Sequence, residues 1–126
     1  MRNLVLLLLG LALGAFATTS VINTLRQRDA YPRGLMQVMQ HHYVALRDDV
    51  RHNRCSDSSR AHLAFLRQLT DEMDAAVYPG AMPDVPFHEY EQRLRGGLNA
   101  AASCAELPAA FDKISAACDA CHQQYR

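Results

Sequence analysis

The sequence contains no tryptophan, and only one of its thirteen basic residues, Lys113, is a lysine. Thirteen acidic residues balance the basic ones, and a net charge of zero gives no reason to expect a nucleic-acid partner. After the N-terminal segment, no stretch alternates between apolar and polar residues for long enough to predict a strand. Alanine and leucine dominate the composition, which favours an all-α fold. The 126 residues, 49% of them hydrophobic, suit one globular domain.

Residues 1–17 have the features of a signal peptide. Arg2 supplies a positive charge, an apolar run follows from Leu4 to Leu13, and Ala15-Phe16-Ala17 matches the small-x-small pattern of a cleavage site. Cleavage after this pattern would leave residues 18–126 as the mature domain.

The alternative is that the same segment stays in place as an anchor in the inner membrane. A membrane-spanning helix needs about 20 apolar residues, so the span would have to continue through the polar residues Thr18, Thr19, Ser20 and Asn23. Both outcomes predict export to the periplasm, because Arg2 favours the cytoplasmic side of the membrane. Contact with the membrane is expected only if the segment is retained.

Four stretches show a helical spacing of apolar residues, at about 31–52, 56–77, 86–103 and 108–126. Their apolar positions follow one another at intervals of three and four residues, which is the packing pattern of helical bundles. Short links join the stretches. The sequence therefore predicts an antiparallel up-down-up-down four-helix bundle.

Local signals refine the ends of these helices. Pro32 is expected in the first turn of the first helix, where the missing N–H is tolerated. Ser58 or Ser59 is expected to cap the second helix. Gly96 and Gly97 lie inside the third helix; they predict either a weak helix or the close approach of a neighbouring group.

Cys118-Asp119-Ala120-Cys121-His122 is the attachment signature of c-type haem. Residues three apart lie on one face of a helix, so both thiols can form thioether bonds to the vinyl groups of one haem. His122 can then offer its imidazole to the iron as an axial ligand. The motif thus predicts one covalently bound haem c and its iron.

Three other interpretations of the motif are weaker. A redox-active Cys-x-x-Cys belongs at the start of a helix, where the dipole lowers the pKa of the first thiol, whereas this one ends a helix. A zinc site would need a fourth ligand, and no second Cys/His pair has matching spacing. A disulfide within the motif would be short and strained on a helix.

The chain resembles the cytochrome c prime family, the class II c-type cytochromes. The haem motif followed by Tyr125-Arg126 at the end of the last helix is similar to that family's C-terminus. The first helix carries a similar pattern of Arg, Leu-x-x-Met and an aromatic residue, made here by Arg33, Leu35, Met36, Met39, His42 and Tyr43. The resemblance covers the whole mature chain, and Pro32 departs from it.

The resemblance implies one haem held between the helices, with the first helix facing the side opposite His122. Met36 is the possible sixth ligand, Met39 one turn further on is the alternative, and His42 is a weaker candidate. Both methionines are also suited to plain core packing, because methionine fills irregular gaps. Arg33 is a possible contact of a haem propionate or an exposed residue at the helix start. Tyr43 and Phe111 are expected in the haem pocket. The remaining histidines, apart from His122, are expected at the surface: His41, His52, His62 and His88.

These features together predict an exported mono-haem cytochrome for periplasmic electron transfer, with an unidentified redox protein as its partner, and not an enzyme. One alternative is a protein of the same fold that binds small gases such as nitric oxide at five-coordinate iron. Another is a helical bundle without haem, stapled by disulfides. The resemblance also allows a homodimer.

Cys55 and Cys104 lie outside the motif. In an antiparallel bundle, Cys55 falls in the link between the first two helices and Cys104 follows the third, so both lie at the same end. An exported protein meets an oxidising compartment, which predicts a disulfide if the two Cα atoms come within about 7 Å. The alternative is two unrelated cysteines, one buried and one at the surface.

Overall fold

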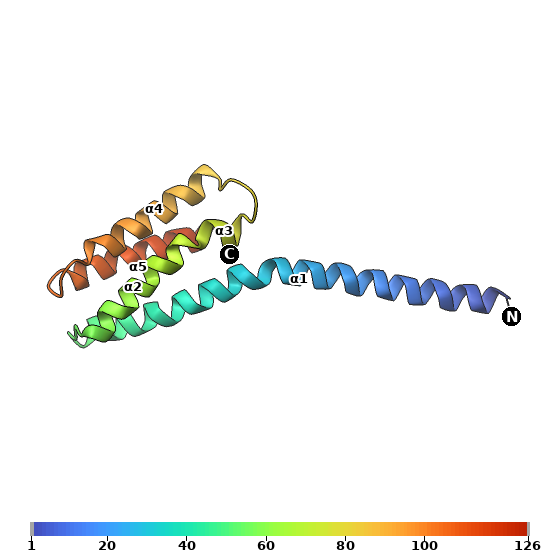
Figure 1. The fold of residues 1–126 in the computed structure, drawn as a ribbon, viewed down its shortest axis with the longest axis horizontal. Helices are drawn as coiled ribbons and strands as arrows, with labels where there is room; N and C mark the ends of the chain where they lie inside the picture. The colour runs from blue at the N-terminus through green and yellow to red at the C-terminus, as the bar shows by residue number, and fades with distance from the viewer. Residues whose placement is uncertain (1, 126) are drawn as a thin grey trace. The chain divides into compact units, whose positions relative to one another are not determined.

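The computed structural model describes residues 2–125, without the side chains at positions 2, 4–6 and 24–29. Within this range the chain is all-helical, as predicted, and holds no strand. The side chain of Arg2, used in the signal-peptide prediction, and Arg126, the last residue of the family pattern, lie outside the described part. The helices shown in Figure 1 are α1 (Arg2–Arg51), α2 (Asp57–Asp71), α3 (Met73–Val77), α4 (Val85–Ala100) and α5 (Leu107–Gln124).

The chain divides into two compact units, Met1–Arg33 and Gly34–Arg126. In the first unit, the Thr18 hydroxyl donates a 2.7 Å hydrogen bond to the carbonyl of Gly14, so the polar residues after the apolar run stay within the helix. Across the described residues, none of the helices combines the length and the apolar character needed to cross a bilayer. The large apolar side chains described in this unit are exposed: Leu7, Leu8, Leu9, Leu11, Leu13, Phe16, Val21, Ile22 and Tyr31.

Helix α1 runs through Pro32, so the predicted start of the first helix at this proline is wrong. Proline removes one backbone donor from a helix interior. α1 is nevertheless continuous from Arg2 to Arg51.

The second unit packs its helices around one apolar core. The core follows the predicted spacing: Met39 and Leu46 are buried, whereas Met36, Tyr43 and Val50 of the same stripe are partly buried. Burial of such side chains is the main stabilising contribution to a helical domain. The other core residues are Leu35 of α1, Leu63 and Leu66 of α2, Met73 and Ala76 of α3, Phe87, Leu94 and Leu98 of α4, Ala101 after it, and Leu107, Ala110, Phe111, Ile114 and Ala117 of α5.

The predicted second helix is divided into α2 and α3 at Glu72. Just before the division, the buried hydroxyl of Thr70 donates a 2.7 Å hydrogen bond to the carbonyl of Leu66. The backbone N–H of Glu72 bonds to the carbonyl of Leu69, three residues earlier, at 3.2 Å. This tighter turn ends α2, and α3 begins at Met73.

Ser56, rather than the predicted Ser58 or Ser59, caps α2. Its hydroxyl accepts from the N–H of Ser59, while the hydroxyl of Ser59 accepts from the N–H of Ser56 at 3.1 Å. The fully buried Ser59 also donates a 2.7 Å hydrogen bond to Asp49 of α1. This reciprocal capping box therefore fixes the start of α2 against the end of α1.

Helices α4 and α5 lie side by side (Figure 1), and they approach each other closely at Gly97. A Cβ atom at position 97 would lie 3.0 Å from the backbone N of Ile114 and 3.1 Å from its Cγ1. A Cβ atom at Gly96 would meet nothing within 4 Å. Of the two predicted explanations for this glycine pair, close approach of a neighbour is correct at Gly97.

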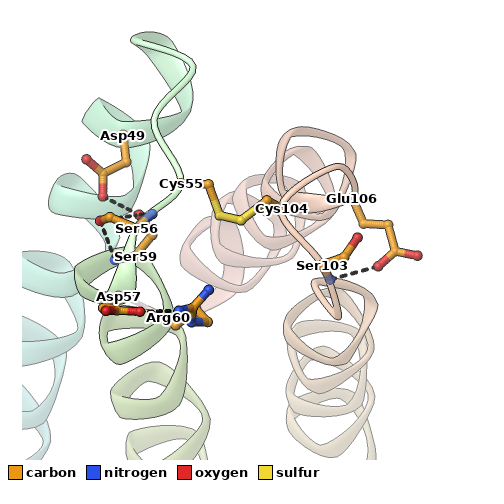
Figure 2. Close-up of a disulfide and its surroundings, with 9 residues drawn as sticks. All are labelled: Asp49, Cys55, Ser56, Asp57, Ser59, Arg60, Ser103, Cys104 and Glu106. Atoms are coloured by element: carbon orange, nitrogen blue, oxygen red, sulfur yellow. Dashed lines mark hydrogen bonds and ion pairs between the residues drawn. A yellow bond between two sulfur atoms is a disulfide. The ribbon is translucent and has the colours of Figure 1, made fainter.

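Cys55 and Cys104 form the disulfide predicted from the sequence, with their Cα atoms 5.6 Å apart. The bond joins the link between α1 and α2 to the link between α4 and α5, which lie at the same end of the second unit (Figure 1). Figure 2 shows the capping residues of α2 directly beside it, together with the Asp57–Arg60 ion pair. The N–H of Ser103, beside Cys104, donates to the carboxylate of Glu106 at 2.9 Å. Both links are therefore held by local bonds and by the disulfide.

The C-terminal end of α5 is held by Asp84, which precedes α4. One oxygen of Asp84 accepts from the N–H of Phe87 at 2.8 Å and from the hydroxyl of Tyr125 at 2.6 Å. The other oxygen accepts from the hydroxyl of Tyr78 at 2.9 Å. A single carboxylate thus caps α4 and ties the end of α5 to the start of α4.

Candidate functional site

A cavity of about 200 Å³ lies within the second unit and is lined by residues from α1 to α5. Its largest group of polar lining residues comes from the last turns of α5, where Cys118, Asp119, Cys121 and His122 all contribute. Cys118 and Cys121 are three positions apart, which places both on one face of the helix, and both line the cavity. The structure therefore brings both cysteines and the histidine of the motif to one cavity.

The two thiols are partly buried and resist ionisation. Burial raises the pKa of Cys118 to about 11, with smaller contributions from the nearby Asp119 and Cys121. Burial also raises the pKa of Cys121. Reactive and zinc-binding cysteines work as thiolates, so this environment disfavours a redox-active or zinc-binding role for the pair.

Methionines face the same cavity from other helices. Met36 and Met39, the two sixth-ligand candidates of α1, both line it. Met73 of α3 lines it as well and is 4% exposed. Three of the five methionines in the chain thus converge on one cavity. From the sequence, Met73 could be assigned only to the apolar stripe of the predicted second helix. The turn at Glu72, after which α3 begins, has no clear sequence signal.

Tyr43 forms part of the cavity wall, and Phe111 supports it from behind; the place of both in a haem pocket stays a prediction. The Tyr43 hydroxyl shares a 3.0 Å hydrogen bond with the hydroxyl of Ser115. The rings of Tyr43 and Phe111 stack with centroids 5.1 Å apart. Phe111 is buried and is not among the residues that line the cavity. These contacts fix the position of Tyr43 between α1 and α5.

Apolar residues complete much of the remaining wall. Leu66, Leu94 and Ile114 line it and are each at most 5% exposed. Gln40 is a further polar lining residue, and neither Gln40 nor Asp119 was a candidate from the sequence. A mostly apolar wall with a few convergent polar groups is typical of a cofactor site.

His42 lies elsewhere, so the structure gives no support to it as a sixth ligand. It does not line the cavity. Its Nδ1 lies 2.9 Å from Nδ1 of His62, and its ring stacks on Phe65 with centroids 4.8 Å apart. His42 and His62 are both partly buried, so His62 is less exposed than expected. His41, His52 and His88 are exposed, as expected.

Arg33 is exposed and belongs to the unit Met1–Arg33. The cavity belongs to the other unit. The contact of Arg33 with a haem propionate therefore remains a prediction.

Comparison with protein-family models, with curated proteins and with solved structures finds no match for this chain.

Proposed function

We propose that this protein is an exported mono-haem c-type cytochrome that transfers electrons in the periplasm. The observation that carries the proposal is the convergence of Cys118, Cys121 and His122 on one cavity that Met36 and Met39 also line. The haem would be attached through the two cysteines, with His122 as axial ligand and Met36, or Met39 as the alternative, as sixth ligand. This is the arrangement that the resemblance to the cytochrome c prime family implies.

The donor set fits a c-type haem. Two thiols three residues apart can form two thioether bonds to one ring, and a neighbouring imidazole can reach the iron of that ring. Both thiols are free of the Cys55–Cys104 disulfide, as attachment to a haem requires. The wall made by Leu66, Leu94 and Ile114 offers apolar contact to a porphyrin.

When bound, the haem supplies an iron that exchanges one electron between its ferrous and ferric states. The residues of the chain hold and shield this centre. His122 would donate a nitrogen lone pair and a methionine thioether a sulfur lone pair, a combination that raises the reduction potential. The apolar wall keeps water out, and low local polarity also tunes the potential.

A four-helix bundle is the corresponding fold proposal. The second unit supports it, because α2 and α3 together can act as one of four helices, beside residues 34–51 of α1, α4 and α5. The disulfide supports it too, since it joins the two links that an up-down-up-down order places at one end.

Export is proposed from the N-terminal segment, with residues 1–17 as signal peptide or as retained anchor and 18–126 as the haem domain. The Cys55–Cys104 disulfide supports this location, because disulfides persist in oxidising compartments such as the periplasm.

Haem staining on a denaturing gel tests the proposal, with protein produced in a host that attaches haem to c-type cytochromes. We expect the wild-type band to stain and the double variant Cys118→Ala/Cys121→Ala to stay unstained, because only covalent haem survives denaturation. The matched control Cys55→Ala/Cys104→Ala removes the other two cysteines and should still stain. An unstained wild-type band would contradict the proposal and favour a disulfide-stapled bundle without haem.

A further inference from the structure

A second group of metal-ligating side chains lies outside the cavity, where α3 is followed by α4. Asp74 of α3 and His88 and Glu91 of α4 each present one ligand atom, and these atoms all lie within 4.8 Å of one another. None of the three lines the cavity of the proposed haem. The proposed function makes no use of them.

The charges in this group are not balanced by the protein. Glu91 is only 2% exposed, and its Oε1 accepts from Nη2 and Nε of Arg95 at 2.6 and 3.2 Å. The same guanidinium also pairs with Asp71, so one positive charge serves two carboxylates. Asp74 adds a third carboxylate; the residue is partly buried, and its Oδ1 is a buried atom with no hydrogen-bond partner among the described residues. Buried carboxylate oxygens are normally paired or bound to a metal, so this oxygen is available to a cation.

His88 supplies the nitrogen ligand at the open side of the group. It is exposed, and its Nδ1 lies 3.5 Å from Oε2 of the buried Glu91, which is beyond a good hydrogen-bond length. Its Nε2 lies 2.9 Å from the side-chain amide of Gln92. A metal-ligating histidine usually donates its other ring N–H to a neighbouring group. If the side-chain amide of Gln92 turns over, its oxygen can accept the N–H of Nε2. Nδ1 of His88 is then the nitrogen that binds the metal.

We infer that Asp74, His88 and Glu91 form a binding site for a divalent transition-metal ion of the zinc type. One imidazole nitrogen and two carboxylate oxygens are ligands that Zn²⁺ accepts, with water in the fourth position. Ligand atoms around tetrahedral zinc lie about 3.4 Å apart, so the three ligand atoms, which lie within 4.8 Å of one another, would have to draw closer together to hold the ion. The divalent charge would offset the negative charge of Asp74, which Arg95 does not pair with.

Such an ion would join α3 to α4 across the intervening loop. Asp74 follows Met73, which lines the cavity, so the ion would also fix the position of this methionine.

Equilibrium dialysis against ⁶⁵Zn²⁺ tests the inference on the full chain after treatment with EDTA. The measurement is made on the wild type and on Cys118→Ala/Cys121→Ala, so that any contribution of these two thiols in a chain that lacks haem is detected. We expect one high-affinity zinc ion per chain in both proteins. His88→Ala and Asp74→Asn should each weaken binding by roughly tenfold or more, because each removes one ligand. Circular dichroism in EDTA checks that both variants remain folded.

The matched control is His62→Ala, which removes a histidine from the His42–His62 pair. It should leave the zinc affinity unchanged. Zinc should also raise the melting temperature of the wild type but not that of His88→Ala. Absence of zinc binding, unchanged affinity in His88→Ala, or loss of affinity in His62→Ala would each overturn the inference. None of these outcomes depends on the presence of haem.

Discussion

The hydroxyl of Tyr125 donates a 2.6 Å hydrogen bond to Asp84, across 41 positions in the sequence. This bond makes the largest contribution to lowering the pKa of Asp84 below its ordinary value of 3.8. The hydrogen bonds from the N–H of Phe87 and the hydroxyl of Tyr78 lower this pKa as well. The stabilisation that it contributes is therefore fully present above about pH 4. It is lost as the pH falls through the lowered pKa of the folded state.

Tyr125→Phe should lower the melting temperature at pH 6 and should reduce the loss of stability between pH 5 and pH 3. The variant removes the donor, while the ring can still pack edge-on against Phe87, 5.5 Å away between centroids. Thermal melts across this pH range provide the measurement. Equal acid sensitivity in the variant and the wild type would show that the bond contributes nothing.

Gly97→Ala should destabilise the protein by about 1 to 3 kcal/mol, because the new methyl group meets the backbone of α5 at Ile114. The matched control is Gly96→Ala, where the added Cβ meets nothing within 4 Å. This substitution should stabilise the helix by about 0.5 to 1 kcal/mol. Urea unfolding measures both free energies. A shift of the same sign in the two variants would argue against close packing at Gly97.

Alkylation of the denatured protein counts its free thiols. The chain has four cysteines, of which two form the disulfide. If haem is attached to Cys118 and Cys121, mass spectrometry should find no alkylated cysteine without reductant and two after reduction. A protein without haem would show two alkylated cysteines without reductant and four after reduction. Alkylation of Cys55 and Cys104 before reduction would contradict the disulfide.

His42 makes the stability depend on pH near neutrality. Burial lowers its pKa first, and the neighbouring His62 and His41 lower it further. The unfolded chain therefore takes up this proton at a higher pH than the folded protein, so stability should fall as the pH drops from 7 to 5. His62→Gln should flatten this dependence, whereas His52→Gln, outside the cluster, should leave it unchanged. Urea midpoints at several pH values provide the test.

Met36→Ala should convert a low-spin haem spectrum to a high-spin one. The oxidised wild type should show the far-red band of a thioether bound to iron, and the variant should lose it. Loss of the band in Met39→Ala instead would move the ligand one turn along α1. A high-spin wild type would exclude methionine ligation and favour a five-coordinate, gas-binding protein.

Much of the fold follows from local patterns in the sequence. Apolar spacing located the helices of the second unit to within a few residues, because their core positions repeat at the period of the helix. Ser56 was missed as the cap because Ser56, Ser58 and Ser59 follow one another closely, and the residue type alone does not say which hydroxyl accepts the hydrogen bond of the first turn. The pairing of Cys55 with Cys104 was predictable because helix order alone brings their links to one end.

The cavity was predictable only in part. The haem signature identified Cys118, Cys121 and His122, and helical spacing identified Met36 and Met39. Met73 reaches the cavity only because α2 ends at Glu72. Asp74 and Glu91 come together with His88 through the path of the loop between α3 and α4, which no periodicity encodes.

The close approach of α5 to Gly97 also bears on the two thiols of the haem signature. Ile114, Cys118 and Cys121 follow one another at intervals of four and three residues, so they point in nearly the same direction from the helix. Both the backbone N and Cγ1 of Ile114 lie where a side chain at position 97 would begin. A side chain at this position of α4 would therefore push against the same face of α5 that carries both thiols.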